Sequence, residues 1–312
     1  MTSGLVRTGM SLTLLAVLVW WLDAGALIGR LAEFDPRWAL AAVVISLPQI
    51  LLLAFRWRFT AARLGLDLSF GTALREYYLA TFLNQVLPGG VMGDASRALR
   101  HGHAGSEGHI GPAARAVIVE RASGQVVMGV VAVLSLASLP LAFSAAPPTI
   151  ALAVCGVGVG VAALAALLVF GRGPRAGRLA ALRRDVHVAL FARDAVYVQL
   201  LSSTLLVGTY LATYVVAARA VGVSTPLWTL LPLVAPVLLS MLIPATVAGW
   251  GVRETTAAAL WGAVGLTVVD GVAISAAYGI LVLIASLPGV LVLLSSLQLR
   301  SRSKSMSSPS GT

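Results

Sequence analysis

Residues 84–97 read NQVLPGGVMGDASR and close a hydrophobic stretch, 71–97, that is long enough to enter a membrane. Pro88 removes a backbone donor, and the paired glycines Gly89 and Gly90 weaken a helix, so a helix entering this stretch must break. Broken backbone at membrane depth is tolerated only where protein buries it or a water-filled cavity accepts its hydrogen bonds. The stretch therefore predicts a broken helix beside a polar cavity.

The composition of the whole chain indicates that this cavity lies in a membrane protein. Of 312 residues, 58% are hydrophobic and 11% are charged, and the mean hydropathy is +0.92. These values exclude a water-soluble fold. At about 20 residues per crossing, the length accommodates about six to nine membrane segments. We expect an all-α integral membrane protein with one transmembrane domain over 1–299 and a disordered, basic and serine-rich tail over 300–312.

About six spanning helices are predicted from long apolar runs. The first run carries a small-residue sequence at 24–26 that resembles a signal-peptidase site, but the run continues past it, so we expect the helix to be retained. The runs are 10–28, 38–55, 123–143, 149–170, 196–216 and 268–299.

The distribution of basic residues predicts the orientation of these runs. Arginines cluster at 56–63, in the loop 171–195 and beyond residue 299, which places these segments and both termini in the cytoplasm. The stretch 71–97 then starts and ends on the cytoplasmic side, as a re-entrant hairpin. The stretch 227–261 must likewise return to the outer side as a second hairpin. The predicted location is the plasma membrane, crossed several times.

The second hairpin repeats the spacing of the first. Each contains a proline, then four residues, a glycine, three residues and an arginine. The alternative explanation is a chance match in a chain with 31 glycines. Two oppositely oriented broken hairpins are typical of the inverted repeats with which transporters build a midplane site. The helix-breaking residues are Pro88, Gly89, Gly90 and Gly93 in the first hairpin, and Pro244, Gly249 and Gly251 in the second.

Charged side chains in these hairpins and in the helix that follows the first are candidates for binding a lipid headgroup. Each costs about 2.5–3.5 kcal/mol on insertion scales, and an arginine fork binds phosphate bidentately. Purely structural ion pairs are the alternative. Adjacent Glu120 and Arg121 point apart on a helix, so one can pair with the hairpin while the other meets a ligand. The candidates are Asn84, Asp94, Arg97, Glu120, Arg121, Arg253 and Glu254.

Other classes of site find little support in the sequence. Three of the four histidines lie at 101, 103 and 109 without a supporting carboxylate pattern, so no metal is expected. Cys155 is the single cysteine, which excludes an intrachain disulfide. The net charge of +10 resides in short loops, not in a nucleic-acid-binding domain. We expect no cofactor, no catalytic residue and no nucleic-acid partner.

Several motifs resemble one known family, the transmembrane domain of lysylphosphatidylglycerol synthase/flippase proteins. The resemblance spans about 10–297 and implies a multi-helix domain that moves, or helps to move, a phospholipid or related amphiphile between leaflets. Full-length members carry a soluble transferase domain, which we do not expect here because the chain stops at Thr312. The motifs are residues 84–97, Val119, Glu120, Arg121 and Gly124, AGWGVRE at 248–254, and Ser275, Tyr278, Gly279, Pro288 and Gly289.

Three functional hypotheses remain open. The first is a lipid flippase or lipid-handling transporter whose partners are membrane lipids. The second is an intramembrane phosphatase acting on a lipid or polyprenyl phosphate, although no P-loop or serine–histidine pair supports it. The third is a non-catalytic membrane partner of a separately encoded lipid-modifying enzyme.

Overall fold

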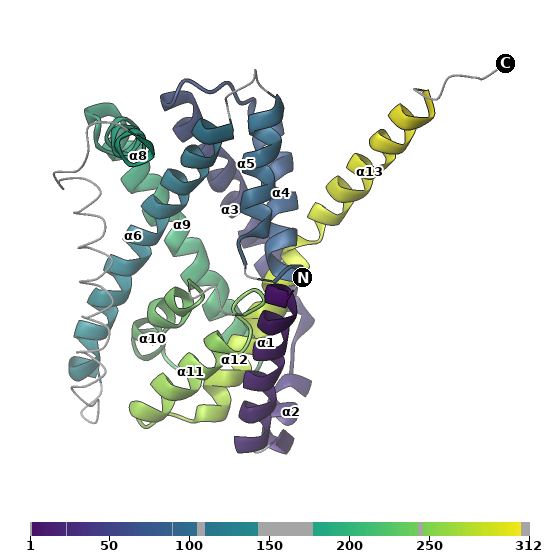
Figure 1. The fold of residues 1–312 in the computed structure, drawn as a ribbon. Helices are drawn as coiled ribbons and strands as arrows, with labels where there is room; N and C mark the ends of the chain where they lie inside the picture. The colour runs from purple at the N-terminus through teal and green to yellow at the C-terminus, as the bar shows by residue number, and fades with distance from the viewer. Residues whose placement is uncertain are drawn as a thin grey trace.

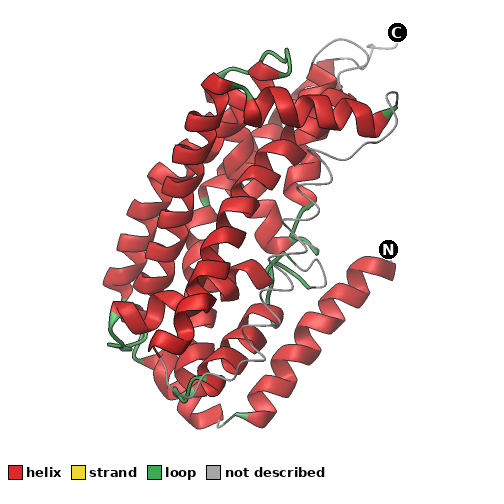
Figure 2. Cartoon of the chain, turned by 90° about the vertical axis from the view of Figure 1, so that its left-hand side faces the viewer, coloured by secondary structure: helices red, strands yellow, loops and turns green. Residues whose placement is uncertain are grey.

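The computed structural model describes residues 2–22, 24–88, 90–104, 110–142, 177–242 and 246–306, and almost all of them are helical (Figures 1 and 2). The expected all-α architecture is confirmed. The elements are α1 (Thr2–Trp21), α2 (Ala24–Ala32), α3 (Pro36–Arg63), α4 (Phe70–Val86), α5 (Met92–Ala104), α6 (Ile110–Ala142), α8 (Arg178–Val186), the π-helical turn η1 (His187–Phe191), α9 (Arg193–Ala220), α10 (Leu227–Ser240), α11 (Val252–Ala263), α12 (Val268–Ser286) and α13 (Pro288–Met306).

Within the described residues, four helices are long and apolar enough to cross a membrane. Helix α3 has 28 residues, or about 42 Å at 1.5 Å per residue, which exceeds the roughly 30 Å of a hydrocarbon core. Asp35 caps its first turn by accepting a bond from the backbone N–H of Arg37 at 2.9 Å. The four are Pro36–Arg63, Ile110–Leu139, Arg193–Ala220 and Val268–Ser286.

Two of the apolar runs are not single helices, contrary to expectation. The run 10–28 is divided between α1 and α2, and the run 268–299 is divided between α12 and α13. Pro288 explains the second division, because it cannot donate a helical hydrogen bond and disfavours helical backbone before it. Helix α13 continues to Met306, past the predicted boundary at 299. The run 149–170 lies outside the described residues.

Helices α4 and α5 form the first broken pair and pack against each other. Helix α4 starts after Ser69, whose hydroxyl accepts a bond from the N–H of Thr72 at 3.2 Å, and it ends at the extended residue Leu87 before Pro88. Gly90 then takes a positive φ of 62°, which glycine adopts without strain. The break falls where the proline and glycines predict it, although Gly89 itself lies outside the described residues.

Helices α10 and α11 form the second broken pair. The segment between them has positive φ values at Ala248, Gly249 and Gly251, so the chain reverses through left-handed backbone. Glu254 caps the start of α11, because its carboxylate accepts a hydrogen bond from the backbone N–H of Gly251 at 2.7 Å. Pro244 lies outside the described residues.

The two breaks meet. Pro88 and Val247 form an antiparallel β-bridge, the one isolated bridge in the described part of the chain. The N–H of Val247 also donates to the hydroxyl of Ser11 on α1 at 2.8 Å, so a third element holds the junction. Figure 1 shows α4 and α5 in the half of the bundle that carries α8, and α10 and α11 in the opposite half. The pairs therefore approach each other from opposite ends.

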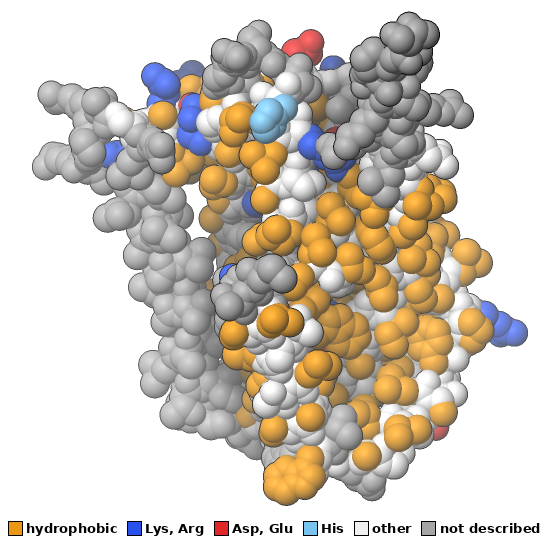
Figure 3. All heavy atoms as spheres, turned by 45° about the vertical axis from the view of Figure 1, so that its right-hand side comes forward, with side chains coloured by type: hydrophobic (Ala, Val, Ile, Leu, Met, Phe, Trp, Pro, Cys, Tyr) orange, Lys and Arg blue, Asp and Glu red, His pale blue; other side chains and the backbone are white. Residues whose placement is uncertain are grey.

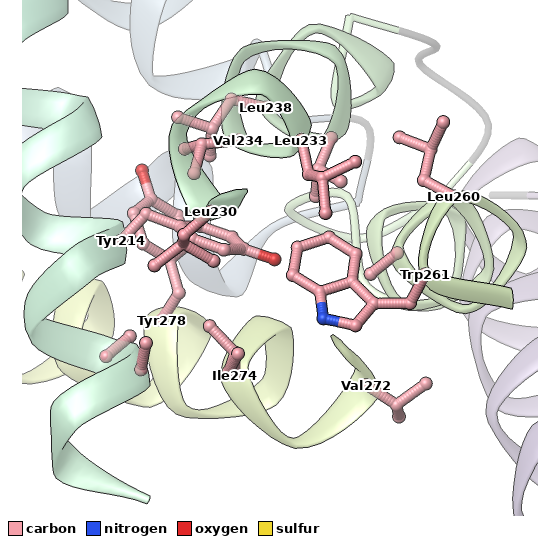
Figure 4. Packing of buried hydrophobic residues seen from close by; sticks show 14 of the residues in the cluster. Tyr214, Leu230, Leu233, Val234, Leu238, Leu260, Trp261, Val272, Ile274 and Tyr278 are labelled. Atoms are coloured by element: carbon pink, nitrogen blue, oxygen red, sulfur yellow. The ribbon is translucent and has the colours of Figure 1, made fainter. Parts of the chain in front are cut away.

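The surface and the core divide by chemistry along the bundle. On the face in Figure 3, hydrophobic side chains cover most of the surface, and charged side chains gather mainly at the end that carries α8. Inside, Trp261, Leu230 and Tyr214 belong to a core cluster to which α6 and α9 to α12 contribute (Figure 4). At the charged end, ion pairs hold the described part of the basic segment 171–195, namely Arg63 with Asp194 and Arg115 with Asp185.

Gly93 sets how closely α4 and α5 approach, and its replacement tests the pair. A Cβ at Gly93 would lie 2.0 Å from the carbonyl oxygen of Ala80 on α4. Gly93→Ala should therefore destabilise the detergent-solubilised protein by about 1–3 kcal/mol in thermal unfolding. The matched control is Gly71→Ala, where nothing lies within 4 Å and alanine should be neutral or stabilising. Equal stability of the two variants would contradict this packing.

The contact between the two breaks predicts a specific cross-link. Residues across an antiparallel bridge have Cα atoms about 4.5–5.5 Å apart, within the range of a disulfide. Because Cys155 is the single native cysteine, a Cys155→Ala background isolates the test. Pro88→Cys with Val247→Cys should cross-link rapidly under mild oxidation. Pro88→Cys with Val223→Cys, in the loop that precedes α10, should not; cross-linking of both pairs at one rate would argue against the junction.

Candidate functional site

A cavity of about 230 Å³ lies where the two broken pairs meet. Asn84 and Gly90 line it from the first pair, and Thr246 and Gly249 line it from the second. Arg121 of α6 is the one charged residue in its described lining. The cavity is therefore polar at the two breaks and positively charged on one wall.

Arg97 occupies a wholly buried position behind this wall. Its Nε donates to Asp94 at 3.0 Å, and its Nη2 donates to Glu120 at 2.9 Å. Its guanidinium lies 4.7 Å from the ring centre of Trp57 and 4.1 Å from that of Tyr77, in cation–π geometry. The buried charge is thus met by two carboxylates and two aromatic faces.

Glu120 joins a second buried arginine to the same group. Its carboxylate accepts the hydroxyl of Tyr77 at 2.5 Å and lies 3.5 Å from the Nε of Arg56. Arg56 also donates to the backbone carbonyl of Glu120 at 3.0 Å, to Ser123 at 2.7 Å and to Ser203. These contacts connect α3, α6 and α9.

Asp94 links the buried arginines to the cavity wall. Its carboxylate accepts Asn84 at 3.1 Å and lies 2.5 Å from the Nη2 of Arg121. Arg121 keeps 39% of its side-chain area exposed. We refer to Arg56, Asp94, Arg97, Glu120 and Arg121 as the arginine–carboxylate cluster. Three arginines face two carboxylates in it, so one positive charge is left over, and Arg121 presents it to the cavity.

A second ionic group lies in the other broken pair and is balanced. Arg253 and Glu254 are each 1% exposed, and their side chains pair at 2.6 Å. Ser275 of α12 accepts from Arg253 at 2.9 Å and donates to Glu254 at 3.1 Å. The guanidinium lies 5.1 Å from the ring centre of Trp250 and 5.2 Å from that of Tyr278.

The candidates from the sequence thus fall into two groups. Asn84, Asp94 and Arg97 join Glu120 and Arg121 in the first, while Arg253 and Glu254 form the second. Glu120 and Arg121 both bind residues of the first hairpin, whereas one of them was expected to be free for a ligand.

Neither Arg97 nor Arg253 lines the cavity, although both were expected to face a shared pocket. Tyr77, which stacks on Arg97, and Tyr278, which stacks on Arg253, do line it. Each buried arginine is therefore covered by a tyrosine on its cavity side.

Arg56 is the residue that the sequence reasoning missed. Arg56 was counted only among the basic residues that follow an apolar run, but α3 continues to Arg63 and buries Arg56 at 1% exposure. The signal was the helical spacing of Arg56 and Thr60, which places both on the face that also buries Trp57. A count of positive charges does not use this spacing.

Fold and site together define the class of protein: a multi-pass, all-α membrane protein with a polar cavity between two broken helix pairs. The family model for the lysylphosphatidylglycerol synthase TM region matches residues 9–289, so the chain belongs to this family, as the motifs predicted. Membership indicates a lipid-related function in a membrane. No curated protein matches the chain.

Glu120→Gln tests how much the arginine–carboxylate cluster contributes to the stability of the protein. It removes one of two carboxylates that balance three buried or half-buried arginines, and breaking a buried pair costs about 3–5 kcal/mol. The control Glu33→Gln changes a side chain that is 59% exposed and should shift stability by less than about 0.5 kcal/mol. Thermal unfolding in detergent measures both.

A second substitution separates charge imbalance from general damage at the same place. Adding Arg56→Met to Glu120→Gln removes one excess charge and should restore part of the lost stability. A double variant less stable than Glu120→Gln alone would count against the charge argument.

Proposed function

We propose that this protein moves a lipid with an anionic headgroup between leaflets, and that the headgroup phosphate binds at Arg121. The uncompensated positive charge of the arginine–carboxylate cluster carries the proposal, because it faces a cavity of about 230 Å³ between two broken helix pairs. Arg121 shares its carboxylate partner Asp94 with Arg97, so its charge is only partly neutralised. A partly neutralised arginine beside a cavity favours an anion, and a guanidinium offers phosphate two parallel donors.

The meeting of the two breaks supports movement across the membrane. We infer that α4/α5 enters from the cytoplasmic side and α10/α11 from the outer side, because basic residues gather at the end that carries α8. The bridge between Pro88 and Val247 then lies near the middle of the bilayer, where transporters with inverted repeats hold their substrates. We propose in addition that the membrane is the plasma membrane and that the basic segments lie in the cytoplasm.

The function is proposed as transport and not as catalysis. Of the described residues that line the cavity, one is charged, Arg121, and it pairs with Asp94 at 2.5 Å. That pair can hold a phosphate in place, and it supplies no free base for attack on phosphorus. Release of inorganic phosphate from a lipid phosphate would reverse this assignment.

Leaflet-resolved transport in proteoliposomes tests the proposal. With fluorescently labelled phosphatidylglycerol, the wild type should accelerate exposure of inner-leaflet lipid to a membrane-impermeant quencher. Arg121→Gln should slow it about tenfold or more, which corresponds to about 1.4 kcal/mol of lost binding in the transport step. The matched control is Arg184→Gln on the exposed face of α8, which should keep the wild-type rate.

Two results would reject the proposal. One is a wild-type rate equal to that of empty vesicles. The other is an Arg121→Gln rate equal to that of Arg184→Gln, with both variants correctly folded by size-exclusion chromatography.

A further inference from the structure

The cavity is rich in neutral hydrogen-bonding groups. Gln49 of α3, Gln85 of α4 and Gln125 of α6 all line it, and no side-chain hydrogen bond engages any of the three within the part of the chain described. The hydroxyl of Thr246, also in the lining, is buried and has no hydrogen-bond partner among the described residues. Three amides and a hydroxyl are therefore free to bind a ligand.

Among the described residues, no free carboxylate lies in the same place. Asp94 is 7% exposed and accepts Asn84, Arg97 and Arg121, and Glu120 is 1% exposed and accepts Tyr77 and Arg97. Neither lines the cavity. A ligand ammonium would consequently lose water, meet the positive charge of Arg121 and find no counter-charge.

The volume of the cavity limits what it holds. About 230 Å³ is below the roughly 300–1,000 Å³ that encloses a drug-sized ligand, so a headgroup fits while acyl chains stay in the surrounding bilayer. Recognition must then act on the headgroup.

We propose that this site selects lipids whose phosphate carries an uncharged, hydroxyl-bearing headgroup, of the phosphoglycerol or phosphosugar class, over lipids whose headgroup carries an amine. The inference rests on the proposed function. Arg121 binds the phosphate, and the glutamines bind the hydroxyls, because an amide offers both a donor and an acceptor to a hydroxyl group. A site built to hydrogen-bond a hydroxyl discriminates strongly against ligands that leave its polar groups unpaired.

Binding of short-chain lipids to the detergent-solubilised full chain tests the selection. The probes are the dioctanoyl forms of phosphatidylglycerol, phosphatidylethanolamine and lysylphosphatidylglycerol, and the readout is tryptophan fluorescence or thermal stabilisation. Phosphatidylglycerol should bind about tenfold more tightly than either amine-bearing lipid. The headgroup without chains, glycerophosphoglycerol, should bind at least about tenfold more weakly than the lipid, because it lacks the apolar contribution of the chains.

Variants of the glutamines give a second, independent measurement. Gln85→Leu with Gln125→Leu should reduce the preference for phosphatidylglycerol to about twofold or less. Gln125→Glu adds a carboxylate to the cavity and should shift the preference toward the amine-bearing lipids. The matched control Gln298→Leu lies on the exposed part of α13 and should leave the preference at its wild-type value.

The outcomes separate this inference from the proposed function. Equal or tighter binding of the amine-bearing lipids by the wild type, with binding still dependent on Arg121, overturns the headgroup selection and leaves transport standing. Absence of any lipid binding overturns both. Binding of glycerophosphoglycerol as tight as that of the lipid would identify a soluble phosphate ester as the ligand and would overturn the lipid class.

Discussion

The structure depends on the pairing of Arg97 with Asp94 and Glu120 inside a hydrophobic bundle. An unpaired charge there would cost several kcal/mol, so each charged group in this region fixes the position of its partners. Glu120 holds Arg97 and Arg56, and through them α3, α5, α6 and α9 converge at one point. The cluster therefore connects these helices, and one of its members, Arg121, lines the cavity.

The two halves of the apparent repeat neutralise their buried arginines differently. In the second half, Arg253 pairs with its neighbour Glu254, and the pair is neutral and local to α11 and α12. In the first half, the ions come from three helices and leave one positive charge. Similar spacing in the sequence thus produces a neutral ion pair at one break and a group with one excess positive charge at the other. Of these two ionic groups, only the second contributes a charged residue, Arg121, to the cavity lining.

The sequence predicts the class of fold and the positions of both breaks, because hydropathy, proline and glycine act locally. It also selects Asp94, Arg97, Glu120 and Arg121, because charges are costly at membrane depth. It does not predict which arginine faces the cavity. That depends on how α4, α5 and α6 rotate about their axes, which contacts such as Gly93 against Ala80 determine. Arg56 was missed for a related reason: burial depends on the partner helices that cover one face of α3.

The covering of Arg97 by Tyr77 and of Arg253 by Tyr278 bears on how a transport site must bind. A substrate has to be held firmly enough to enter and weakly enough to leave, as in conduction through channels. Three unpaired guanidinium groups around one phosphate would bind too tightly for release. Here the carboxylates engage the buried arginines and the tyrosines screen them, so the cavity meets a single cation. In the transport that we propose, Arg121 alone would then make and break the contact with the phosphate.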